Sequence, residues 1–375
     1  MVTKKKYMTK LMENEKYLTE QIITYIGNKR SLLDFIGEAV EIVRTELNKE
    51  KLDIADLFSG SGIVARYLKK YSNKIITNDL ENYSYTLNKC YLSNEKDINI
   101  DKIVSYYNRL KDRLEEKHIS GFITKLYAPE DDGNIRKGER VFYTNKNARY
   151  IDTCRQTIAT FPVDIQHFFI APLLTEASVK NNTGGVFKGF YKNRETGIGQ
   201  FGGTAENALS RIKADIDIPF PVFSNFNAEV INYQCDANAL IDTLEEVDLL
   251  YLDPPYNQHP YGSNYFMLNL INDYIEPENI SEVSGIPEDW NRSGYNKKNK
   301  SLSILYDLCK KAKAKYILIS FNSEGFITKE QMENMLKKTG TVRTLKKKYN
   351  TYRASRNLNN RNTYVHEYLF LVRKS

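Results

Sequence analysis

The tetrapeptide Asp253-Pro254-Pro255-Tyr256 combines a carboxylate, carbonyl acceptors and an aromatic ring at one point of the chain. Each proline fixes φ and lacks a backbone N–H group, so carbonyl oxygens stand beside the carboxylate without competing donors. A flat base with an exocyclic amine fits this set. Its amine would donate to Asp253 and to the Pro254 carbonyl, and Tyr256 would stack on its ring. The plain alternative is a turn after a strand with a surface tyrosine.

A glycine-rich turn from Phe58 to Gly62 follows one apolar run and precedes a helical pattern. Glycine lets the backbone turn sharply and approach a ligand closely, although many α/β proteins have such a turn. Asp79 ends the next apolar run, where a carboxylate can accept both hydroxyls of a ribose. Asp79 could also cap the following helix, since Asp is favoured there, and both interpretations stay open.

Both motifs require strands that end at the same edge of a sheet. Apolar residues recur every three to four positions from Leu33 to Leu47, which predicts a helix before the first strand. The following alternation of strands and helices predicts an α/β domain with a parallel sheet, whose ligands bind at the carboxyl ends of the strands. The predicted strands are residues 52–58, 75–79, 228–235, 247–252, 315–321 and 365–374.

The alternation breaks between about residues 95 and 225, where a charged helix, a loop near Pro129 and a Gly/Asn-rich segment (181–203) follow one another. Long structureless loops are uncommon in compact domains, so the insertion should have its own fold. We expect one domain made of residues 1–95 and 226–375, interrupted by a second domain of residues 96–225.

Composition narrows the class of protein. The 375 residues carry 54 Lys and Arg against 47 Asp and Glu, a net charge of +7 that favours an anionic partner. No apolar run approaches the ~20 residues of a membrane span, and the first residues lack the apolar segment of a secretory signal. The four cysteines are scattered, which argues against a disulfide framework or a zinc site. We expect a cytoplasmic protein without a metal site.

The stretch 334–366 holds nine Lys or Arg residues and no Asp or Glu. Basic, aromatic and amide side chains together suit phosphate and base-edge contacts, whereas a solvated charged surface is the plain alternative. Residues 342–356 should form a strand end and a loop beside the active-site edge. Segment 181–203 is a second candidate contact, or a flexible loop. The candidate DNA-binding residues are Lys188, Lys192, Arg194, Lys346, Lys347, Lys348, Arg353 and Arg356.

Five features together resemble the DNA adenine-N6 methyltransferases that use S-adenosylmethionine, in the class whose target-recognition domain is inserted before DPPY. They are the run from Tyr25 to Lys29 (YIGNK), the glycine turn, Asp79, Asp236 in CDANALI, and DPPY. The resemblance covers residues 22–95 and 228–375, and the insertion resembles the family only in its position. Tyr25 stands where relatives often have Trp, and Asn28 where many have Gly.

The resemblance implies a Rossmann-like methyltransferase sheet with an inserted target-recognition domain. Lys29 would pair with the carboxylate of the methyl donor, Asp79 would hold its ribose, and Asp236 would accept from its adenine amine. Asp253 would lie between the two substrates, and Tyr256 would stack on the target base. The implied donor-binding residues are Tyr25, Lys29, Phe58, Ser59, Gly60, Gly62, Asp79, Asp236 and Asp253, and the implied catalytic residues are Asp253, Pro254, Pro255 and Tyr256.

These features predict a sequence-specific enzyme that methylates N6 of an adenine flipped out of double-stranded DNA, in a restriction–modification or orphan system. We expect a monomer, associated with the nucleoid through DNA, with a cognate restriction endonuclease as a candidate partner. The alternatives are a cytosine-N4 or RNA amino-methyltransferase and a catalytically silent DNA-binding specificity subunit. Cytosine-N4 enzymes more often carry Ser in place of Asp253, and the intact motifs argue against lost activity. His259 could act as a base, but without a partner it fits a loop residue better.

Overall fold

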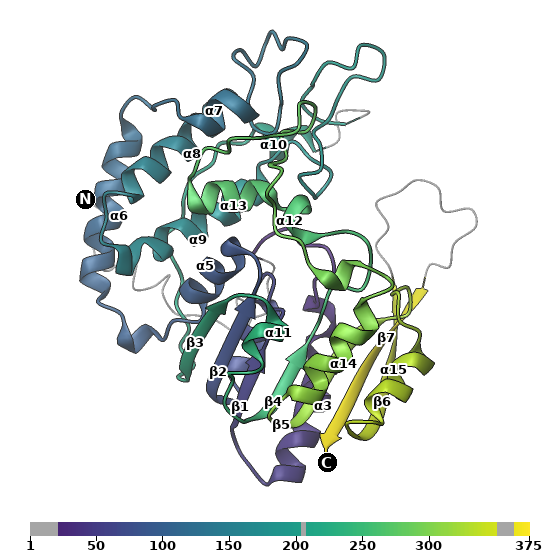
Figure 1. Cartoon of the computed structure of the whole chain (residues 1–375). Coiled ribbons are helices and arrows are strands. Elements are labelled where there is room, and N and C mark those ends of the chain that lie inside the picture. Colours follow the sequence, from purple (N-terminus) through teal and green to yellow (C-terminus); the bar gives the residue numbers. More distant parts are fainter. Residues whose placement is uncertain (1–21, 204–207, 351–363) are drawn as a thin grey trace.

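The computed structural model describes residues 22–203, 208–350 and 364–375 of the chain. Seven strands form one sheet in the order β3-β2-β1-β4-β5-β7-β6 (Figure 1). Strands β1 to β5 are parallel, and β7 runs antiparallel between β5 and β6. The strands are β1 (Leu52–Asp56), β2 (Ser72–Asp79), β3 (Glu229–Gln234), β4 (Val247–Leu252), β5 (Ala314–Asn322), β6 (Gly340–Asn350) and β7 (Tyr364–Lys374).

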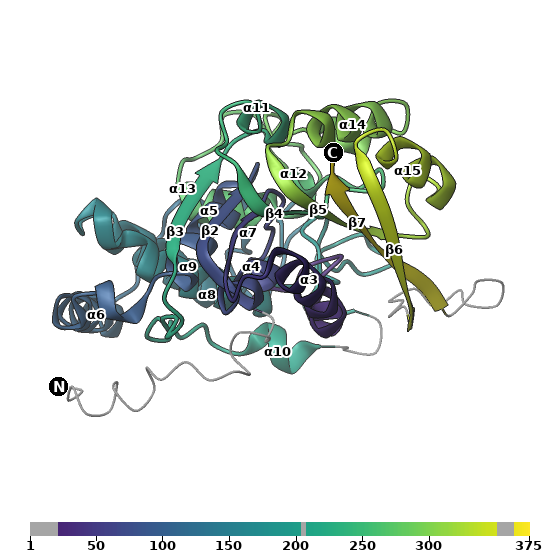
Figure 2. The ribbon, with the colours of Figure 1, turned by 90° about the horizontal axis from the view of Figure 1, so that it is seen from below.

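The central strand β4 shows why the sheet is covered on both faces. All six residues of β4 are buried, as expected of a parallel strand with helices on either side. Leu249 packs into the core on one face, and its neighbour Leu250 packs into the core on the other. Helices α3 (Leu33–Leu47) and α4 (Ile63–Lys69) cover the first face, and α11 (Ala237–Leu240), α14 (Ser301–Lys311) and α15 (Lys329–Leu336) cover the second (Figure 2).

The sequence-based elements of this domain are confirmed. The predicted helix 33–47 is α3, and each predicted strand overlaps an observed one. The strand expected in the basic stretch is β6, whereas the loop expected after it lies outside the described residues.

The interruption of the α/β pattern is a helical unit, in the upper part of Figure 1. Its core also takes in α13, which follows DPPY in the chain, and α5, which follows β2. The division of the chain at residues 95 and 226 therefore stays a proposal, because residues beyond 226 share this core. The unit is built from α5 (Asn82–Tyr91), η2 (Glu95–Asp97), α6 (Ile100–Glu115), α7 (Phe122–Tyr127), α8 (Asn145–Ile158), α9 (Val163–Val179), α10 (Leu209–Lys213), α12 (Tyr261–Asn264) and α13 (Phe266–Asp273).

Asp152 on α8 shows how the unit is held together. Its buried carboxylate accepts hydrogen bonds from the backbone N–H groups of Gly121 and Thr124, at 2.8 and 2.9 Å. It also accepts from the hydroxyl of Tyr274, at 2.8 Å, just after α13. A buried carboxylate needs such donors, and here they fix the start of α7 and the end of α13 to α8.

Among the residues that the structure describes, two kinds of feature were not found, a membrane-spanning helix and a metal-binding cluster. No helix among them is long and apolar enough to span a membrane. Within the same residues, no group of three or more His, Cys, Asp or Glu side chains is arranged to hold a metal ion.

Candidate active site

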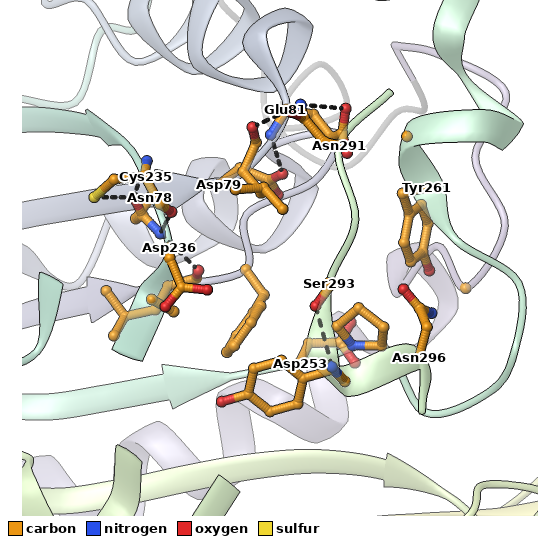
Figure 3. Close-up of a pocket in the computed structure, with 18 of the residues that line it drawn as sticks. Asn78, Asp79, Glu81, Cys235, Asp236, Asp253, Tyr261, Asn291, Ser293 and Asn296 are labelled. Atoms are coloured by element: carbon orange, nitrogen blue, oxygen red, sulfur yellow. Dashed lines mark hydrogen bonds between the residues drawn. The ribbon is translucent and has the colours of Figure 1, made fainter. Parts of the chain in front are cut away.

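One pocket lies at the carboxyl edge of the sheet and collects the ends of four neighbouring strands (Figure 3). It encloses about 710 Å³ of empty space, part of which is open to solvent. Phe58 follows β1, Asp79 ends β2, Asp236 follows β3 and Asp253 follows β4, and all four line the pocket. Because β3, β2, β1 and β4 are consecutive in the sheet, residues far apart in the sequence meet here. Tyr25, from the segment before α3, also lines the pocket.

The glycine turn is bound to the end of β2. The N–H of Gly60 donates to Oδ2 of Asp79 at 2.7 Å, and the N–H of Glu81 donates to Oδ1 at 3.0 Å. Gly60 has φ +52°, and a Cβ there would lie 2.8 Å from the Tyr25 ring. Only glycine allows this backbone to pass so close to Tyr25. The N-cap of α5 is Glu81, so the alternative of Asp79 as the helix cap is wrong, and Asp79 instead holds the turn in place.

An aromatic stack fixes the N-terminal run. The Tyr25 ring stacks on Tyr261 and on Tyr265, with ring centroids 5.0 and 4.8 Å away. The backbone of Ile26 donates to the Tyr265 hydroxyl at 2.7 Å and accepts from the Tyr261 hydroxyl at 3.1 Å. The segment after DPPY therefore positions the segment that carries Lys29.

Lys29 and Asp253 form a buried ion pair, with Nζ 2.9 Å from Oδ2. Lys29 is 3% exposed, and its Nζ also donates to the Gly27 carbonyl at 3.2 Å. Burial by itself would lower the pKa of Lys29, but the carboxylates of Asp253 and Glu367 outweigh it and raise the pKa. Burial raises the pKa of Asp253, and the charge of Lys29 opposes that rise. The sequence placed both residues in the site but did not predict that they touch.

Tyr256 stands beside this pair. Its ring lies edge-on to Phe321, with centroids 5.9 Å apart, and 5.8 Å from Nζ of Lys29. Its carbonyl accepts from the N–H of Phe326 at 2.9 Å, so the loop after β5 holds the DPPY turn. His259 is exposed, three residues further along.

Asp236 lines the pocket, as the sequence suggested, and it also caps a helix, which the sequence did not suggest. Its Oδ1 accepts from the N–H groups of Asn238 and Ala239, at 2.8 and 3.1 Å, and so caps α11. The residue also lines the pocket, beside Ala237. The cap fixes the carboxylate at the pocket wall.

The pocket is also lined by a segment that no sequence motif identified. Four residues of the connection between α13 and α14 line it: Asn291, Ser293, Tyr295 and Asn296. The Tyr295 ring meets Phe58 edge-on, at 5.1 Å between centroids. The segment includes the short helix η4 (Gly294–Asn296). Its sequence, NRSGYN, resembles an ordinary loop, so no local signal identified it.

Hydrogen bonds tie this segment to residues that follow three of the strands, β2, β3 and β4. Asn291 Nδ2 donates to Glu81 Oε2 at 3.2 Å, and the Tyr295 hydroxyl donates to Asn238 Oδ1 at 2.8 Å. Asn296 Nδ2 donates to the Asn257 carbonyl at 2.8 Å. Burial, with the nearby charge of Asp79, raises the pKa of Glu81 to about 7.

The candidate DNA-binding residues that the structure describes lie outside the pocket, in two groups. Lys188, Lys192 and Arg194 are exposed on the helical unit, where Lys192 pairs with Gly199 across a short hairpin. In the second group, Lys346 and Lys348 are exposed on β6, opposite Tyr368 and His366 of β7.

Lys347 differs from its two neighbours. It lies opposite Glu367 and above the Phe35 ring, at 5.6 Å. Successive side chains of a strand point to opposite faces, so the three lysines do not form one patch. Arg353 and Arg356 lie outside the described residues.

The strand order, with an antiparallel strand between β5 and β6, and the DPPY motif at the pocket edge define a Rossmann-like methyltransferase of exocyclic amines. The chain belongs to the D12 class N6 adenine-specific DNA methyltransferases, whose family profile matches residues 25–335. The predicted family and the predicted adenine-specific activity are thereby confirmed. Membership also implies a methyl donor of the S-adenosylmethionine type.

Three relatives show how much of the chain the likeness covers. The type II methyltransferase M.NlaIII of Neisseria lactamica is 29% identical over 94% of this chain and 100% of its own length. M.CviAII of Paramecium bursaria Chlorella virus 1 is 31% identical over 93% of this chain and 98% of its own. M.FokI of Planomicrobium okeanokoites is 30% identical over 93% of this chain but 52% of its own, so this chain matches about half of that protein.

Proposed function

We propose that the enzyme reads a specific sequence in double-stranded DNA, flips one adenine out of the duplex and methylates its N6 with S-adenosylmethionine. The observation that carries this proposal is the position of Asp253, which lines the pocket, contacts Lys29 and is followed by the Pro-Pro-Tyr turn. A carboxylate at this position can face the methyl donor on one side and the target adenine on the other.

The pocket residues fit the donor. Asp79 lies where a ribose would pass, and its carboxylate can accept hydroxyls besides its two backbone bonds, because each oxygen has two lone pairs. Asp236 can accept an adenine amine, and the rings of Phe58 and Tyr295 form an apolar wall for the adenine. The turn around Gly60 brings backbone close to the ligand. Bound there, S-adenosylmethionine supplies an electrophilic methyl group on a sulfonium sulfur.

The residues around DPPY fit the base. An adenine in a duplex hides its amine, so the nucleotide must flip out, at a cost of a few kcal/mol. Stacking on Tyr256 offsets about 1–3 kcal/mol of that cost. The amine lone pair is delocalised into the ring and attacks poorly. Hydrogen bonds from the amine to Asp253 Oδ1 and to the Pro254 carbonyl favour a more tetrahedral nitrogen, and Lys29 holds Oδ2 in place.

Tyr256 offers a direct test of stacking. Tyr256→Phe keeps the ring and should retain most activity, whereas Tyr256→Ala should lower kcat/KM by about 10- to 100-fold, because stacking contributes about 1–3 kcal/mol. Steady-state kinetics on one duplex substrate give both values. Equal rates for the two variants would show that the ring face does not hold the base.

We further propose that residues 96–225 select the DNA sequence. The exposed side chains of Lys188 and of Lys192 and Arg194, which lie on the short hairpin, would be contacts. Arg side chains can read base edges in the major groove. Relatives named as a type II methyltransferase and as a modification methylase support a restriction–modification role with a cognate endonuclease. The enzyme would act as a monomer on DNA in the cytoplasm.

The two faces of β6 give a further prediction. Replacing Lys346 and Lys348 together with Ala should weaken binding to all duplexes similarly and flatten the salt dependence by about two log–log units, at about 0.9 per phosphate contact. Lys347→Ala is the matched control and should leave the slope unchanged, because Lys347 faces Phe35 and Glu367. Fluorescence anisotropy titrations at several salt concentrations measure the slopes. An unchanged slope in the double variant would place the DNA path elsewhere.

A further inference from the structure

The side-chain amide of Asn296 has its two ends in different surroundings. Its Nδ2 donates to the carbonyl oxygens of Asn257 and His259, at 2.8 and 3.4 Å, in the loop that follows the DPPY turn. In the part of the chain that the structure describes, no group donates to its Oδ1. Because Asn296 also lines the pocket, the amide offers a free acceptor there, whereas both of its N–H groups are engaged.

Asn296 lies at one end of the pocket. Figure 3 shows it on the same side as Tyr261, whereas Asp236, the proposed acceptor for the adenine of the methyl donor, lies on the other side. A Cβ at Gly27 would lie 3.2 Å from the Tyr261 hydroxyl, and the Gly27 carbonyl accepts from Lys29. Lys29 is the expected partner of the carboxylate in the methionine part of the donor. Asn296 therefore stands at the end of the pocket where that part would lie.

The methionine part of the donor carries an ammonium group next to its carboxylate. A buried ammonium needs acceptors, and several acceptors at this end of the pocket already have donors. The Gly27 carbonyl accepts from Lys29 at 3.2 Å, and the Ile26 carbonyl accepts from a tyrosine hydroxyl at 3.1 Å. Asp253 holds Lys29 through Oδ2, and its Oδ1 is the proposed acceptor for the target amine. These contacts leave Asn296 Oδ1 free to accept from the ammonium.

The segment that carries Asn296 is held by other contacts besides this amide. The Tyr295 hydroxyl donates to Asn238 Oδ1 at 2.8 Å, and its ring meets Phe58 edge-on. The Ser293 hydroxyl oxygen accepts from the N–H of Tyr295 at 3.2 Å and so caps η4. A group that is already fixed loses little conformational entropy when a ligand binds. Asn296 Oδ1 is thus preorganised to accept a hydrogen bond from a ligand.

Resting on the function proposed above, we propose that Asn296 binds the ammonium group of S-adenosylmethionine through Oδ1. Lys29 and Asn296 then bind the two charged groups of the donor's amino acid, the lysine as hydrogen-bond donor and the amide oxygen as acceptor. An adenosine derivative without the amino group lacks this contact. A site built to bind a polar group rejects analogues that lack it, so Asn296 selects ligands with a complete amino-acid end.

Two ligands that differ only in the amino group test this assignment. S-adenosylhomocysteine carries the amino group, and its desamino analogue lacks it. Calorimetry should show that Asn296→Ala weakens the binding of S-adenosylhomocysteine by about 10- to 100-fold, as expected for one hydrogen bond to a charged group. The affinity for the desamino analogue should stay within about twofold, because this ligand makes no contact with Oδ1.

Two further variants are controls. Asn73 is an exposed asparagine near the start of β2, outside the pocket, and its Nδ2 also donates to a backbone carbonyl, that of Lys51, at 3.4 Å. Asn73→Ala should leave both affinities unchanged. Tyr295→Phe removes the hydrogen bond to Asn238 but keeps the ring at the pocket wall. Any loss that it causes should be equal for the two ligands, because it loosens the segment without removing the acceptor.

Equal losses for the two ligands in Asn296→Ala would overturn the proposal, because the amide would then only hold the segment in place. Unchanged affinity for S-adenosylhomocysteine would also overturn it, and so would equal binding of the two ligands by the unmodified protein. The proposed function fails separately, if the unmodified enzyme binds S-adenosylhomocysteine but transfers no methyl group to adenine. A protein that bound neither ligand would overturn both.

Discussion

Replacing Asp253 with Asn should abolish methyl transfer while leaving the fold in place. Asn has nearly the same shape, but it lacks the negative charge that accepts from the amine and pairs with Lys29 at 2.9 Å. Loss of one electrostatic contact to a reacting group commonly lowers kcat by about 10²–10³-fold. Methylation of duplex DNA with a labelled donor measures the loss.

The control for this variant is Asp242→Asn, an exposed carboxylate that pairs with Lys311 away from the pocket, and it should keep full activity. Thermal unfolding of Asp253→Asn should remain a single cooperative transition, because the amide oxygen can still accept from Lys29. If Asp253→Asn kept a kcat within about threefold of the unmodified enzyme, Asp253 would have no role in the chemical step.

Asp79→Ala should nearly eliminate donor binding. The sequence suggested one task for this carboxylate, accepting two ribose hydroxyls, and the structure adds its bonds to the N–H groups of Gly60 and Glu81. A hydrogen bond to a charged group contributes about 1.5–3 kcal/mol, so losing two hydroxyl contacts and the fixed turn should weaken affinity by at least about 100-fold.

Calorimetric titration with S-adenosylmethionine measures this affinity without DNA. Asp79→Asn keeps one oxygen for the N–H of Glu81 and should fall between Asp79→Ala and the unmodified protein. If Asp79→Ala bound the donor with unchanged affinity, the ribose would lie elsewhere in the pocket.

The sequence predicted the sheet well because its strands are short apolar runs that end in polar motifs. Val247 to Leu252 is buried on both faces, and Asp253 follows at the edge where parallel strands present their ligands. The site residues at the carboxyl ends of β1, β2 and β4 could be found in this way, because the strand order brings these ends together.

Other parts of the site depend on contacts that no local pattern encodes. Tyr295 and Asn291 come from a loop whose hydrogen bonds form only in the folded chain. Glu367 sits within an ordinary strand, and the register of β5 and β7 sets this carboxylate opposite Asn322, where its charge acts on Lys29. The same register separates Lys347 from Lys346 and Lys348, which a count of basic residues treats alike.

The helical unit shows the same limit at the level of domains. The break in the pattern near residue 95 located it, but Phe266 and Leu268, after DPPY, also pack into its core. Tertiary packing, rather than chain order, decides which segments belong together.

The central claim is that this pocket methylates N6 of adenine in double-stranded DNA. The most direct test incubates the purified protein with S-adenosylmethionine and duplex DNA, digests the DNA to nucleosides and identifies the methylated product by mass spectrometry. The structure predicts N6-methyldeoxyadenosine as the product, at one recurring sequence, and none with Asp253→Asn. Formation of N4-methyldeoxycytidine, methylation of RNA alone, or no product from a protein that binds the donor would contradict the claim.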